Sequence, residues 1–360
     1  MRINIMTSCD ETIARFLVVQ FASIQMNLQK YDVHFYLFHN RIQSASIDFI
    51  KNFANKCSCI TFHEVIVNDI QPYEKMADIG GSWPYEAYFS LCAQNYLPNE
   101  MERILYIDAA DVVIHDDILD FYASPFEDKL IIAATAWYKK TEDGKLEEFL
   151  PQDLNDPIYA KKITKGITNS GAFVLNLEKL REENISINDY VTIAENIKNT
   201  YPHFEPTYFG DQGLISAIFL GKIRYFEGQE FSTHPYVQVC SKYHIYSELL
   251  VSFPETPYMK AAILHFGGPV FKPWQAWITP DVVKQYGYLF SDKYKNVNKY
   301  APFTMNWQQC QMNEIWWYYC QQTPIFQESA MYARIAGMTL EHYYLPLCKK
   351  YNDLVDGKCE

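Results

Sequence analysis

The N-terminal part of the chain alternates between two patterns of apolar side chains. Residues 2–8, 33–39 and 59–66 are apolar runs rich in β-branched and aromatic side chains, which is typical of buried strands. Between these runs, residues 11–29 and 42–56 carry apolar side chains at helical spacing. A strand–helix–strand–helix–strand order implies right-handed crossovers between parallel strands. The pattern therefore predicts an α/β fold with a central, mostly parallel sheet flanked by helices.

The middle of the chain continues this pattern and includes one long polar interruption. A helix is expected at residues 85–97, and it leads directly to an apolar strand at residues 103–108. Residues 138–166 are polar, and loops of that length are usually functional or mobile. Further strands are expected at residues 130–136, 172–177, 223–226 and 262–266, and further helices at residues 178–183, 187–200 and 211–220.

After residue 280 the sequence has no strand pattern and becomes rich in aromatic residues. Residues 281–360 have helix-like spacing and carry equal numbers of acidic and basic residues, which argues against a basic membrane-binding helix. We expect a helical cap packed on the core, with a hydrophobic surface for an acceptor or a membrane as the alternative. The predicted organisation is a Rossmann-like domain at residues 1–278 and a helical, aromatic-rich extension at residues 279–360.

The composition limits the partners and the compartment of the protein. The 360 residues have a formal net charge of −12, so the long-range attraction to phosphate expected of a nucleic-acid-binding domain is absent. The nine cysteines form no CxxC pair and no disulfide-like framework, which indicates reduced thiols. The chain begins directly with a predicted strand, and no run of about 18 apolar residues occurs. We therefore expect a cytoplasmic protein with no membrane span and no nucleic-acid partner.

Two aspartates, Asp108 and Asp111, follow the apolar strand at residues 103–108. Charge at the end of a buried strand is costly unless it is paired or binds a metal. Open α/β sheets bind ligands at the carboxyl ends of their strands, which is where these acids lie. Residues i and i+3 of a strand point to opposite faces, so both acids can reach one ion only if the chain turns at Ala109 and Ala110. The alternative is a strand end whose aspartates cap the next turn.

A second cluster of polar residues follows the predicted strand at residues 262–266. His265 lies near the end of this strand, and histidine beside carboxylates is a good ligand for Mn²⁺. Gly267 and Gly268 free backbone N–H groups to bind an anion, and Lys272 adds a point charge for phosphate. A single histidine at a strand end is more often structural, but the compound pattern is far more specific.

Two further motifs place amide and carboxylate side chains at the ends of loops. Asn169 precedes the predicted strand at residues 172–177, and Asp211 and Gln212 open the predicted helix at residues 211–220. Such side chains suit hydrogen bonds to sugar hydroxyls. Each of them is equally typical of a helix cap or an Asx-turn.

With these four motifs in this order, the sequence resembles glycosyltransferase family 8. This family of retaining transferases includes bacterial lipopolysaccharide galactosyl- and glucosyltransferases and glycogenin. The resemblance runs roughly over residues 3–275 and follows the family order of an aspartate loop, an acidic metal motif, Asn-x-Gly, Asp-Gln, and His-Phe-x-Gly-Pro-x-Lys-Pro-Trp. It implies the glycosyltransferase A fold, a nucleotide-diphosphosugar donor, most often UDP-glucose or UDP-galactose, and a divalent cation, Mn²⁺ or Mg²⁺.

The resemblance also implies a reaction and a set of residues at the metal and the phosphates. Asp108, Asp111 and His265 would hold the ion that bridges the diphosphate, and Lys272 and Gly268 would hold the phosphates. The implied reaction transfers glucose or galactose, with retained configuration, to a hydroxyl of a glycan or a lipid-linked saccharide, as in lipopolysaccharide biosynthesis. A peripheral contact with the inner face of the membrane and a homodimer are left open.

The remaining positions that match the family pattern would contact the uridine and the sugar. Ser8 and Cys9 would meet the uridine through their backbone and Asp10 through its side chain. The sugar and the reacting face would be lined by Asn169, Asp211 and Gln212.

Several positions depart from the family pattern and motivate alternatives. The family usually has Asp-x-Asp, whereas this chain has one more residue between Asp108 and Asp111, and its His-to-Lys motif is also one residue longer. The family's frequent arginine falls on Ser90, and the aromatic residue after its N-terminal aspartate falls on Ile13. One alternative is therefore a catalytically impaired UDP-sugar-binding protein. A phosphatase with Asp-x-Asp is another, but the acids lie mid-chain and its Thr/Ser and Lys motifs do not follow.

Overall fold

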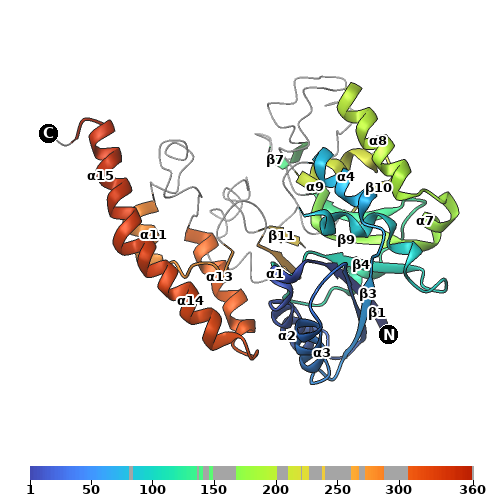
Figure 1. The fold of residues 1–360 in the computed structure, drawn as a ribbon, viewed down its shortest axis with the longest axis horizontal. Coiled ribbons are helices and arrows are strands. Elements are labelled where there is room, and N and C mark those ends of the chain that lie inside the picture. Colours follow the sequence, from blue (N-terminus) through green and yellow to red (C-terminus); the bar gives the residue numbers. More distant parts are fainter. Residues whose placement is uncertain are drawn as a thin grey trace.

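The protein consists of an α/β body followed by a group of helices that extend to one side of it (Figure 1). The N-terminus belongs to the α/β body, and the C-terminus lies at the far end of the helical extension. The residues described in the computed structural model are 1–80, 84–135, 138–140, 146–148, 168–200, 210–219, 221–226, 237–239, 261–266, 272–287 and 307–358.

A seven-stranded sheet forms the centre of the α/β body. Its strands are β1 (Arg2–Ser8), β2 (Asp32–His39), β3 (Ile60–Ile66), β4 (Arg103–Ile107), β6 (Ile131–Thr135), β9 (Thr168–Asn176) and β10 (Ile223–Tyr225). They lie in the order β10-β6-β9-β4-β1-β2-β3. The pairs β1–β2, β2–β3, β1–β4 and β6–β10 are parallel, whereas β9 runs antiparallel to β4 and β6. The predicted mostly parallel sheet is confirmed.

The side chains of the central strands alternate between two hydrophobic cores. On β4, Leu105 and Ile107 pack in one core, whereas Ile104 and Tyr106 pack in the other. All four are buried. A strand that is buried on both faces requires a layer of helices on each side of the sheet.

Helices cover both faces of the sheet, and each layer closes one of the two cores. The first core is closed by α1 (Glu11–Ala14), α2 (Leu17–Asn27), α3 (Ser44–Ala54) and the short α5 (Leu119–Ala123). The second core is closed by α4 (Gln71–Gly80), η1 (Tyr85–Asn95), α7 (Leu177–Glu183), α8 (Ile187–Thr200) and α9 (Gly210–Ile218).

Two smaller sheets accompany the central one. A three-stranded sheet joins β5 (Val112–Ile114), β11 (Val237–Val239) and β12 (Ile263–His265), with β12 in the middle. Strand β12 is parallel to β11 and antiparallel to β5. The short strands β7 (Tyr138–Lys140) and β8 (Leu146–Glu148) pair within the predicted polar excursion, most of which lies outside the described residues.

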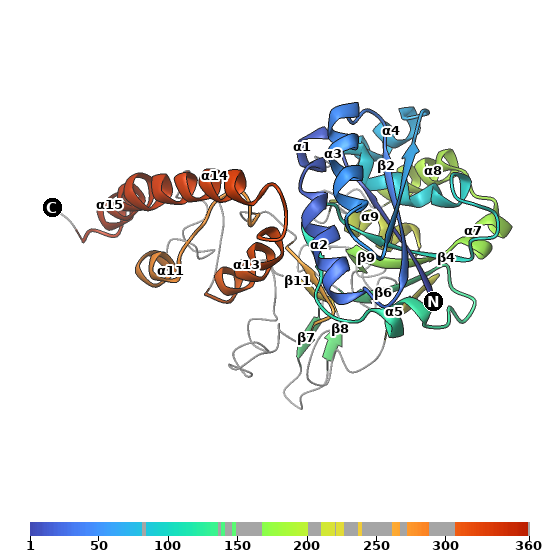
Figure 2. The same ribbon diagram turned by 90° about the horizontal axis from the view of Figure 1, so that it is seen from below.

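The C-terminal extension is helical, as the sequence predicts. It contains α11 (Pro280–Tyr286), α13 (Trp307–Cys320), α14 (Phe326–Thr339), the π-helical turn η6 (Leu340–Tyr344) and α15 (Leu345–Val355). Helix α13 packs on the body, where Trp316 shares a hydrophobic cluster with Val18 and Val19 of α2. Helices α14 and α15 continue as a long rod that runs away from the body (Figure 2). The division of the chain at residue 278 stays a prediction. Within the described residues, no helix has the length and apolar character needed to cross a membrane.

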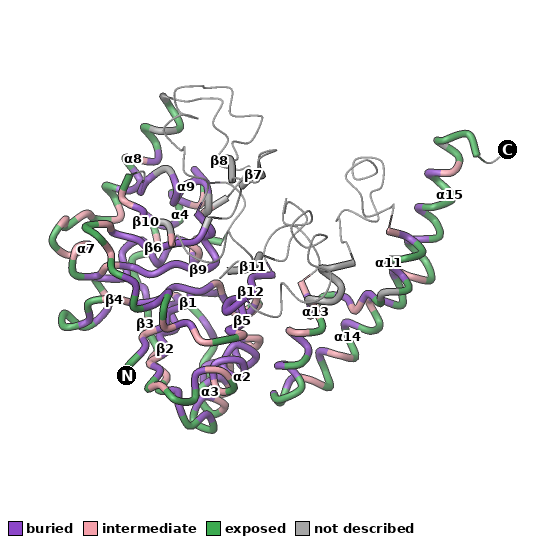
Figure 3. The backbone as a smooth tube through the Cα atoms, turned by 180° about the vertical axis from the view of Figure 1, so that it is seen from behind, coloured by how far each residue is buried: buried purple, intermediate pink, exposed green. Residues whose placement is uncertain are grey.

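The π turn η6 keeps two faces of the α14–α15 rod aligned. Buried residues recur every three or four positions along the rod, except for one step of five across η6. Most of the exposed apolar residues, all but Tyr332 and Tyr344, follow the same spacing. Buried and exposed positions alternate along the whole rod (Figure 3). A π turn closes its hydrogen bonds five residues apart, which matches this step. The buried row is Ser329, Ala333, Gly337, Leu340, Leu345, Cys348 and Asn352, and the exposed row is Met331, Ile335, Met338, Tyr343, Leu347, Tyr351 and Leu354.

The predicted elements are present, with a few differences. The helix expected at residues 85–97 is a 3₁₀ helix with a kink at Cys92, and eight of its eleven residues are buried, so packing sets its geometry. The helix expected at residues 11–29 is interrupted at Arg15 and Phe16, between α1 and α2. Helix α4 and strand β5 were not predicted, because α4 is largely polar and β5 has only three residues.

Candidate metal and donor site

The chain turns sharply between the end of β4 and the start of β5. The Asp111 N–H donates to the Ala109 carbonyl at 2.7 Å, which closes a three-residue turn around Ala110. Ala110 has a φ of +66°, the left-handed conformation of the rarer and more strained type of γ-turn. The prediction that the backbone must leave extended geometry at this point is confirmed.

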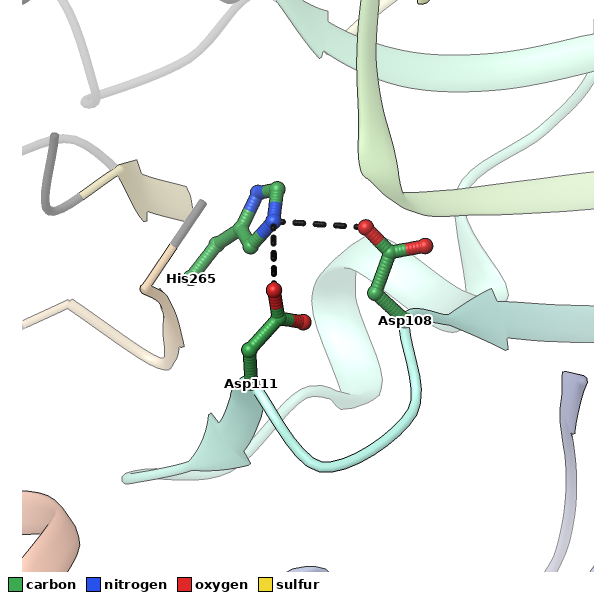
Figure 4. Close-up of side chains that lie close together, drawn as sticks. All are labelled: Asp108, Asp111 and His265. Carbon is green, nitrogen blue, oxygen red and sulfur yellow. Dashed lines mark ion pairs between the residues drawn. The ribbon is translucent and has the colours of Figure 1, made fainter. Parts of the chain in front are cut away.

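This turn places both carboxylates against the imidazole of His265 (Figure 4). His265 comes from β12, where it pairs with Val112 at the start of β5. Its Nε2 lies 3.3 Å from Asp108 Oδ2 and 3.9 Å from Asp111 Oδ2. The three ligand atoms lie within 4.8 Å of one another. The side chains of His265, Asp111 and Asp108 are 8%, 13% and 26% exposed, so Asp108 is the member most open to solvent.

The second ring nitrogen of His265 is held by Asn169 on β9. His265 Nδ1 lies 3.1 Å from Asn169 Oδ1, which also accepts a hydrogen bond from the Gly171 N–H at 2.9 Å. Because Asn169 Oδ1 is an acceptor, the hydrogen of the neutral ring is on Nδ1, and Nε2 presents its lone pair to the carboxylates. Metal-binding histidines commonly have their other N–H anchored in this way.

Asp108 is oriented by contacts on several sides. The Tyr106 hydroxyl donates to Asp108 Oδ1 at 2.9 Å, and Tyr106 stands two residues earlier on the same face of the strand. The Gln20 amide of α2 donates to the Asp108 carbonyl, and the Asp108 N–H donates to the Gly171 carbonyl at 3.0 Å. These contacts leave Asp108 Oδ2 directed toward His265.

Lys272 belongs to the same cluster. Its Nζ donates to Asp111 Oδ2 at 2.5 Å and to the Phe266 carbonyl at 2.8 Å. The Phe266 N–H donates in turn to the Asp111 carbonyl at 2.7 Å, which continues the pairing of β12 with β5 into the turn. The structure therefore brings Lys272 to the predicted metal motif, and its contact with phosphate stays a prediction.

The cluster favours positive charge. Burial lowers the pKa of His265, but the hydrogen bond with Asp108 and the charges of Asp111 and Asp108 outweigh it, so the pKa is raised. The pKa of Tyr106 is also raised, first by burial and then by the charge of Asp108, so its hydroxyl stays a donor. A proton on His265 together with the Lys272 ammonium group, or a divalent cation, can balance the charge of the two carboxylates.

The ligand atoms of this cluster suit a hard divalent cation. Two carboxylate oxygens and one imidazole nitrogen are suitable ligands for Mn²⁺ and, with water completing the shell, for Mg²⁺. Asp111 Oδ1 is buried and has no hydrogen-bond partner among the described residues. Because a buried carboxylate oxygen without a partner is costly, the residues present fit a cation.

The residues predicted to contact the uridine lie at the end of β1. Ser8 ends the strand, Cys9 follows it, and both are buried. Asp10 Oδ1 accepts a hydrogen bond from the Thr12 N–H at 2.9 Å and caps α1. Asp10 therefore has a structural role in the fold, and contact of these residues with a nucleotide stays a prediction.

The residues predicted to line the sugar come from β9 and α9. Asn169 is buried on β9, and Asp211 lies in the first turn of α9. Asp211 lies close enough to Tyr106 for its charge to contribute to the raised pKa of that hydroxyl. The side chain of Gln212 and the whole of Gly268 lie outside the described residues, so the roles predicted for them stay predictions.

Ser90, which the resemblance matched to a frequent arginine of the family pattern, is buried within η1. Its Oγ has no hydrogen-bond partner among the described residues. A serine cannot supply the positive charge of an arginine. Ile13, which the resemblance matched to an aromatic residue of the family pattern, packs against the first hydrophobic core.

Sequence reasoning missed three residues that support the cluster. Tyr106 could have been found, because residues i and i+2 of a strand share a face. Gln20 and Trp316 gave no local signal, since they belong to helices far from the acids in the sequence. Trp316 Nε1 donates to the Ala110 carbonyl at 3.0 Å, within the turn that joins the two aspartates.

Comparison with known proteins places this chain in a family. The model of glycosyl transferase family 8 matches residues 4–278, and the chain belongs to that family. It is 24% identical over 196 residues to the lipopolysaccharide 1,3-galactosyltransferase of Salmonella typhimurium, a match that covers 54% of this chain and 51% of that protein. It is 21% identical over 316 residues to a lipopolysaccharide 1,2-glucosyltransferase of Escherichia coli, covering 83% of this chain and 79% of that protein.

The matched part of some relatives is limited in length. A protein of Haemophilus influenzae is 26% identical over 230 residues, which covers 62% of this chain and 61% of that protein. The chain thus spans less than two thirds of the Haemophilus and Salmonella relatives.

Solved structures share the fold. The galactosyltransferase LgtC, in complex with donor and acceptor sugar analogs, matches with a TM-score of 0.53 at 19% identity, covering 76% of this chain and 89% of that chain. The bifunctional glycosyltransferase WbbM matches with a TM-score of 0.56 at 13% identity, covering 93% of this chain and 52% of that chain. The predicted glycosyltransferase A fold is therefore confirmed.

Proposed function

We propose that this protein is a metal-dependent retaining glycosyltransferase that moves glucose or galactose from a UDP-sugar to a saccharide hydroxyl. The observation that carries the proposal is the convergence of Asp108, Asp111 and His265 in a chain of family 8. A diphosphate needs a local cation in a protein with a net charge of −12. Among the described residues, this cluster is where three such ligand side chains meet.

The residues around the cluster bind and orient the donor. Asp108, Asp111 and His265 would hold a Mn²⁺ or Mg²⁺ ion, which supplies Lewis-acid stabilisation for the charge on the leaving UDP. Asn169 keeps the His265 ring turned so that Nε2 faces the acids, and Tyr106 fixes the Asp108 carboxylate. A site held in this way needs little rearrangement on binding.

Other residues are assigned to the rest of the nucleotide. Lys272 contacts Asp111 in the group of candidate metal ligands, and it is assigned, with Gly268, to the phosphates. Ser8, Cys9 and Asp10, at the end of β1, are assigned to the uridine. Nucleotides bind at the carboxyl ends of the strands in this type of sheet, which supports the assignment.

Retention of configuration constrains the residues near the reacting carbon. A double displacement needs a nucleophile beneath the anomeric carbon. The amide of Gln212 is a poor nucleophile, and Asp211 is the one carboxylate among the residues assigned to the sugar. We favour a same-face reaction: the acceptor oxygen bonds to the anomeric carbon, the bond to UDP breaks, and the acceptor proton passes to the leaving phosphate. Asp211 or Gln212 would stabilise the positive charge on the sugar. Asn169 Nδ2, which has no hydrogen-bond partner among the described residues, is assigned to a sugar hydroxyl.

The acceptor is assigned to surface glycans or lipid-linked saccharides. The Salmonella and Escherichia coli relatives are named as lipopolysaccharide transferases, which supports a role in that biosynthesis. A cytoplasmic location, with a peripheral contact at the inner face of the membrane, belongs to the same proposal.

A second candidate is a UDP-sugar-binding protein that has lost transfer activity. The observation that favours it is Ser90, a buried serine at the position where the family pattern has a cation. A weakened donor site could still bind UDP while failing to support transfer.

A panel of UDP-sugars with Mn²⁺ distinguishes these candidates. We expect UDP to raise the melting temperature, the rise to vanish on chelation, and one UDP-hexose to be hydrolysed slowly or transferred. Binding of UDP without turnover of any UDP-sugar would favour the inactive binder. No thermal shift with UDP, with or without metal, would contradict both candidates.

Asp211→Asn and Gln212→Ala test the stabilisation of the reacting sugar. We expect each to lower the transfer rate about ten-fold or more with little change in UDP affinity, because the lost interaction acts in the transition state. Initial rates and a UDP titration measure the two effects. If both variants keep near-full transfer rates, the roles assigned to Asp211 and Gln212 are wrong.

A further inference from the structure

We propose that Trp316, on the C-terminal helix α13, is a positioning residue for the metal ligands, because it holds the turn that brings Asp108 and Asp111 together. The inference rests on the proposed function, since it concerns how that metal site is built. Trp316 acts through the backbone of Ala110.

The turn around Ala110 is one that alanine resists. A left-handed φ brings the Cβ of an alanine close to the following carbonyl oxygen, which disfavours the conformation. Glycine would adopt it freely, but no glycine stands between Asp108 and Asp111. Such a backbone conformation persists only where the surrounding structure holds it.

The indole N–H of Trp316 stabilises the turn through a hydrogen bond from another element. Its Nε1 donates to the Ala110 carbonyl at 3.0 Å, across a separation of 206 residues. Both residues are fully buried, so water cannot take the place of the donor. Without this N–H the Ala110 carbonyl would be left buried and unsatisfied, and the native turn would lose its advantage over other conformations.

The ring of Trp316 is itself fixed by aromatic neighbours. Its centroid lies 5.4 Å from that of Trp274, 5.0 Å from that of Trp317 and 6.2 Å from that of Phe16. Neighbours on several sides leave the indole one orientation, so its N–H points in one direction. Trp274 ends the motif that begins at His265, which ties this aromatic cluster to the same segment as the metal ligand.

A second contact, one helical turn along α13, holds the far end of β5. The Tyr319 hydroxyl lies 2.7 Å from His115 Nδ1 and accepts a hydrogen bond from Asn27 Nδ2 at 3.0 Å. Asn27 also donates to the Ile114 carbonyl at 2.9 Å. Because Trp316 and Tyr319 are three residues apart, they lie on one face of the helix, and α13 holds β5 at both ends.

Trp316→Phe tests the inference, because it removes the N–H donor and keeps an aromatic ring. We expect Mn²⁺ affinity, measured by isothermal titration, to fall about five-fold to ten-fold. We also expect the Asp111 amide to exchange its hydrogen faster in metal-free protein, since that N–H closes the turn. Trp277→Phe is the matched control, because Trp277 packs against the same cluster with its ring stacked on Trp317, and it should leave both quantities unchanged.

A second substitution separates positioning from a general loss of packing. In the Trp316→Phe background, Ala110→Gly should recover most of the lost Mn²⁺ affinity, because glycine adopts the turn without outside help and restores no packing. If Trp316→Phe fails to fold, a benzothienylalanine at position 316 keeps the shape of the ring without its N–H and provides the same comparison.

Several outcomes would overturn the role of Trp316. These are an unchanged affinity and exchange rate in Trp316→Phe, an equal loss in Trp277→Phe, or no recovery by Ala110→Gly. A wild-type protein that binds no Mn²⁺ would instead contradict the metal site of the proposed function. The exchange rate of the Asp111 amide would then still decide whether Trp316 holds the turn.

Discussion

Replacing Asp108 by Asn is expected to abolish the metal site while the fold remains intact. The asparagine keeps the shape of Asp108 and an oxygen that accepts from Tyr106, but it lacks the charge that attracts the ion. Loss of a residue that only orients a ligand can cost up to about 100-fold in metal affinity. We expect Mn²⁺ affinity to fall by at least about that factor, and transfer by about 1000-fold. Isothermal titration with Mn²⁺ and the rate of UDP release measure the two effects.

Asp120→Asn provides the matched control for this substitution. Asp120 is an exposed aspartate in the first turn of α5, a short distance along the chain from the cluster. Its replacement removes the same charge and should leave Mn²⁺ affinity and transfer unchanged. If Asp108→Asn bound Mn²⁺ as tightly as the wild type, Asp108 would not be a ligand, and the interpretation of the two acids as residues of a strand end would be preferred.

Gly171→Ala is expected to damage both stability and metal binding. A Cβ at Gly171 would overlap the imidazole ring of His265. The Gly171 carbonyl also accepts a hydrogen bond from the Asp108 N–H. Overpacking of this kind costs about 1–3 kcal/mol. Because the His265 ring can relieve the overlap only by moving, we also expect Mn²⁺ affinity to fall about ten-fold or more. Thermal unfolding in the presence of a chelator and a Mn²⁺ titration separate the two losses.

Gly287→Ala is the control for adding a methyl group to a glycine. Gly287 follows α11 with a φ of −55°, and no described residue lies within 4 Å of an added Cβ. This variant should keep its melting temperature and its Mn²⁺ affinity. A Gly171→Ala protein that behaved in the same way would contradict the close packing of His265 against β9.

The central sheet could be predicted from the sequence because its strands are buried on both faces. A continuous apolar run such as residues 103–108 leaves few other interpretations. The order of the strands, with β9 antiparallel between β4 and β6, follows no local pattern, because it depends on which strands meet in space. Short or largely polar elements such as β5 and α4 lack a period that the sequence could reveal.

The ligands of the candidate site could be predicted from the sequence, whereas Gln20 and Trp316, which hold the backbone around them, could not. Asp108, Asp111 and His265 stand out because each follows or ends an apolar run. The turn at Ala110 could be inferred only from the need to bring the acids together, since two alanines carry no turn signal. Nothing in the sequence distinguishes Trp316 from its neighbours in an aromatic helix, because its hydrogen bond depends on how α13 packs.

The π turn η6 also determines which way α15 faces. Each helical residue rotates the chain by about 100°, and the step of five across η6 contains one residue more than an ordinary turn would need. Deleting a single residue there would rotate α15 by about that angle. Leu345 and Cys348 would then leave the cluster that they form with Val282 of α11. Such a deletion would leave the sequence of α15 unchanged, and each of its side chains would face a different neighbour.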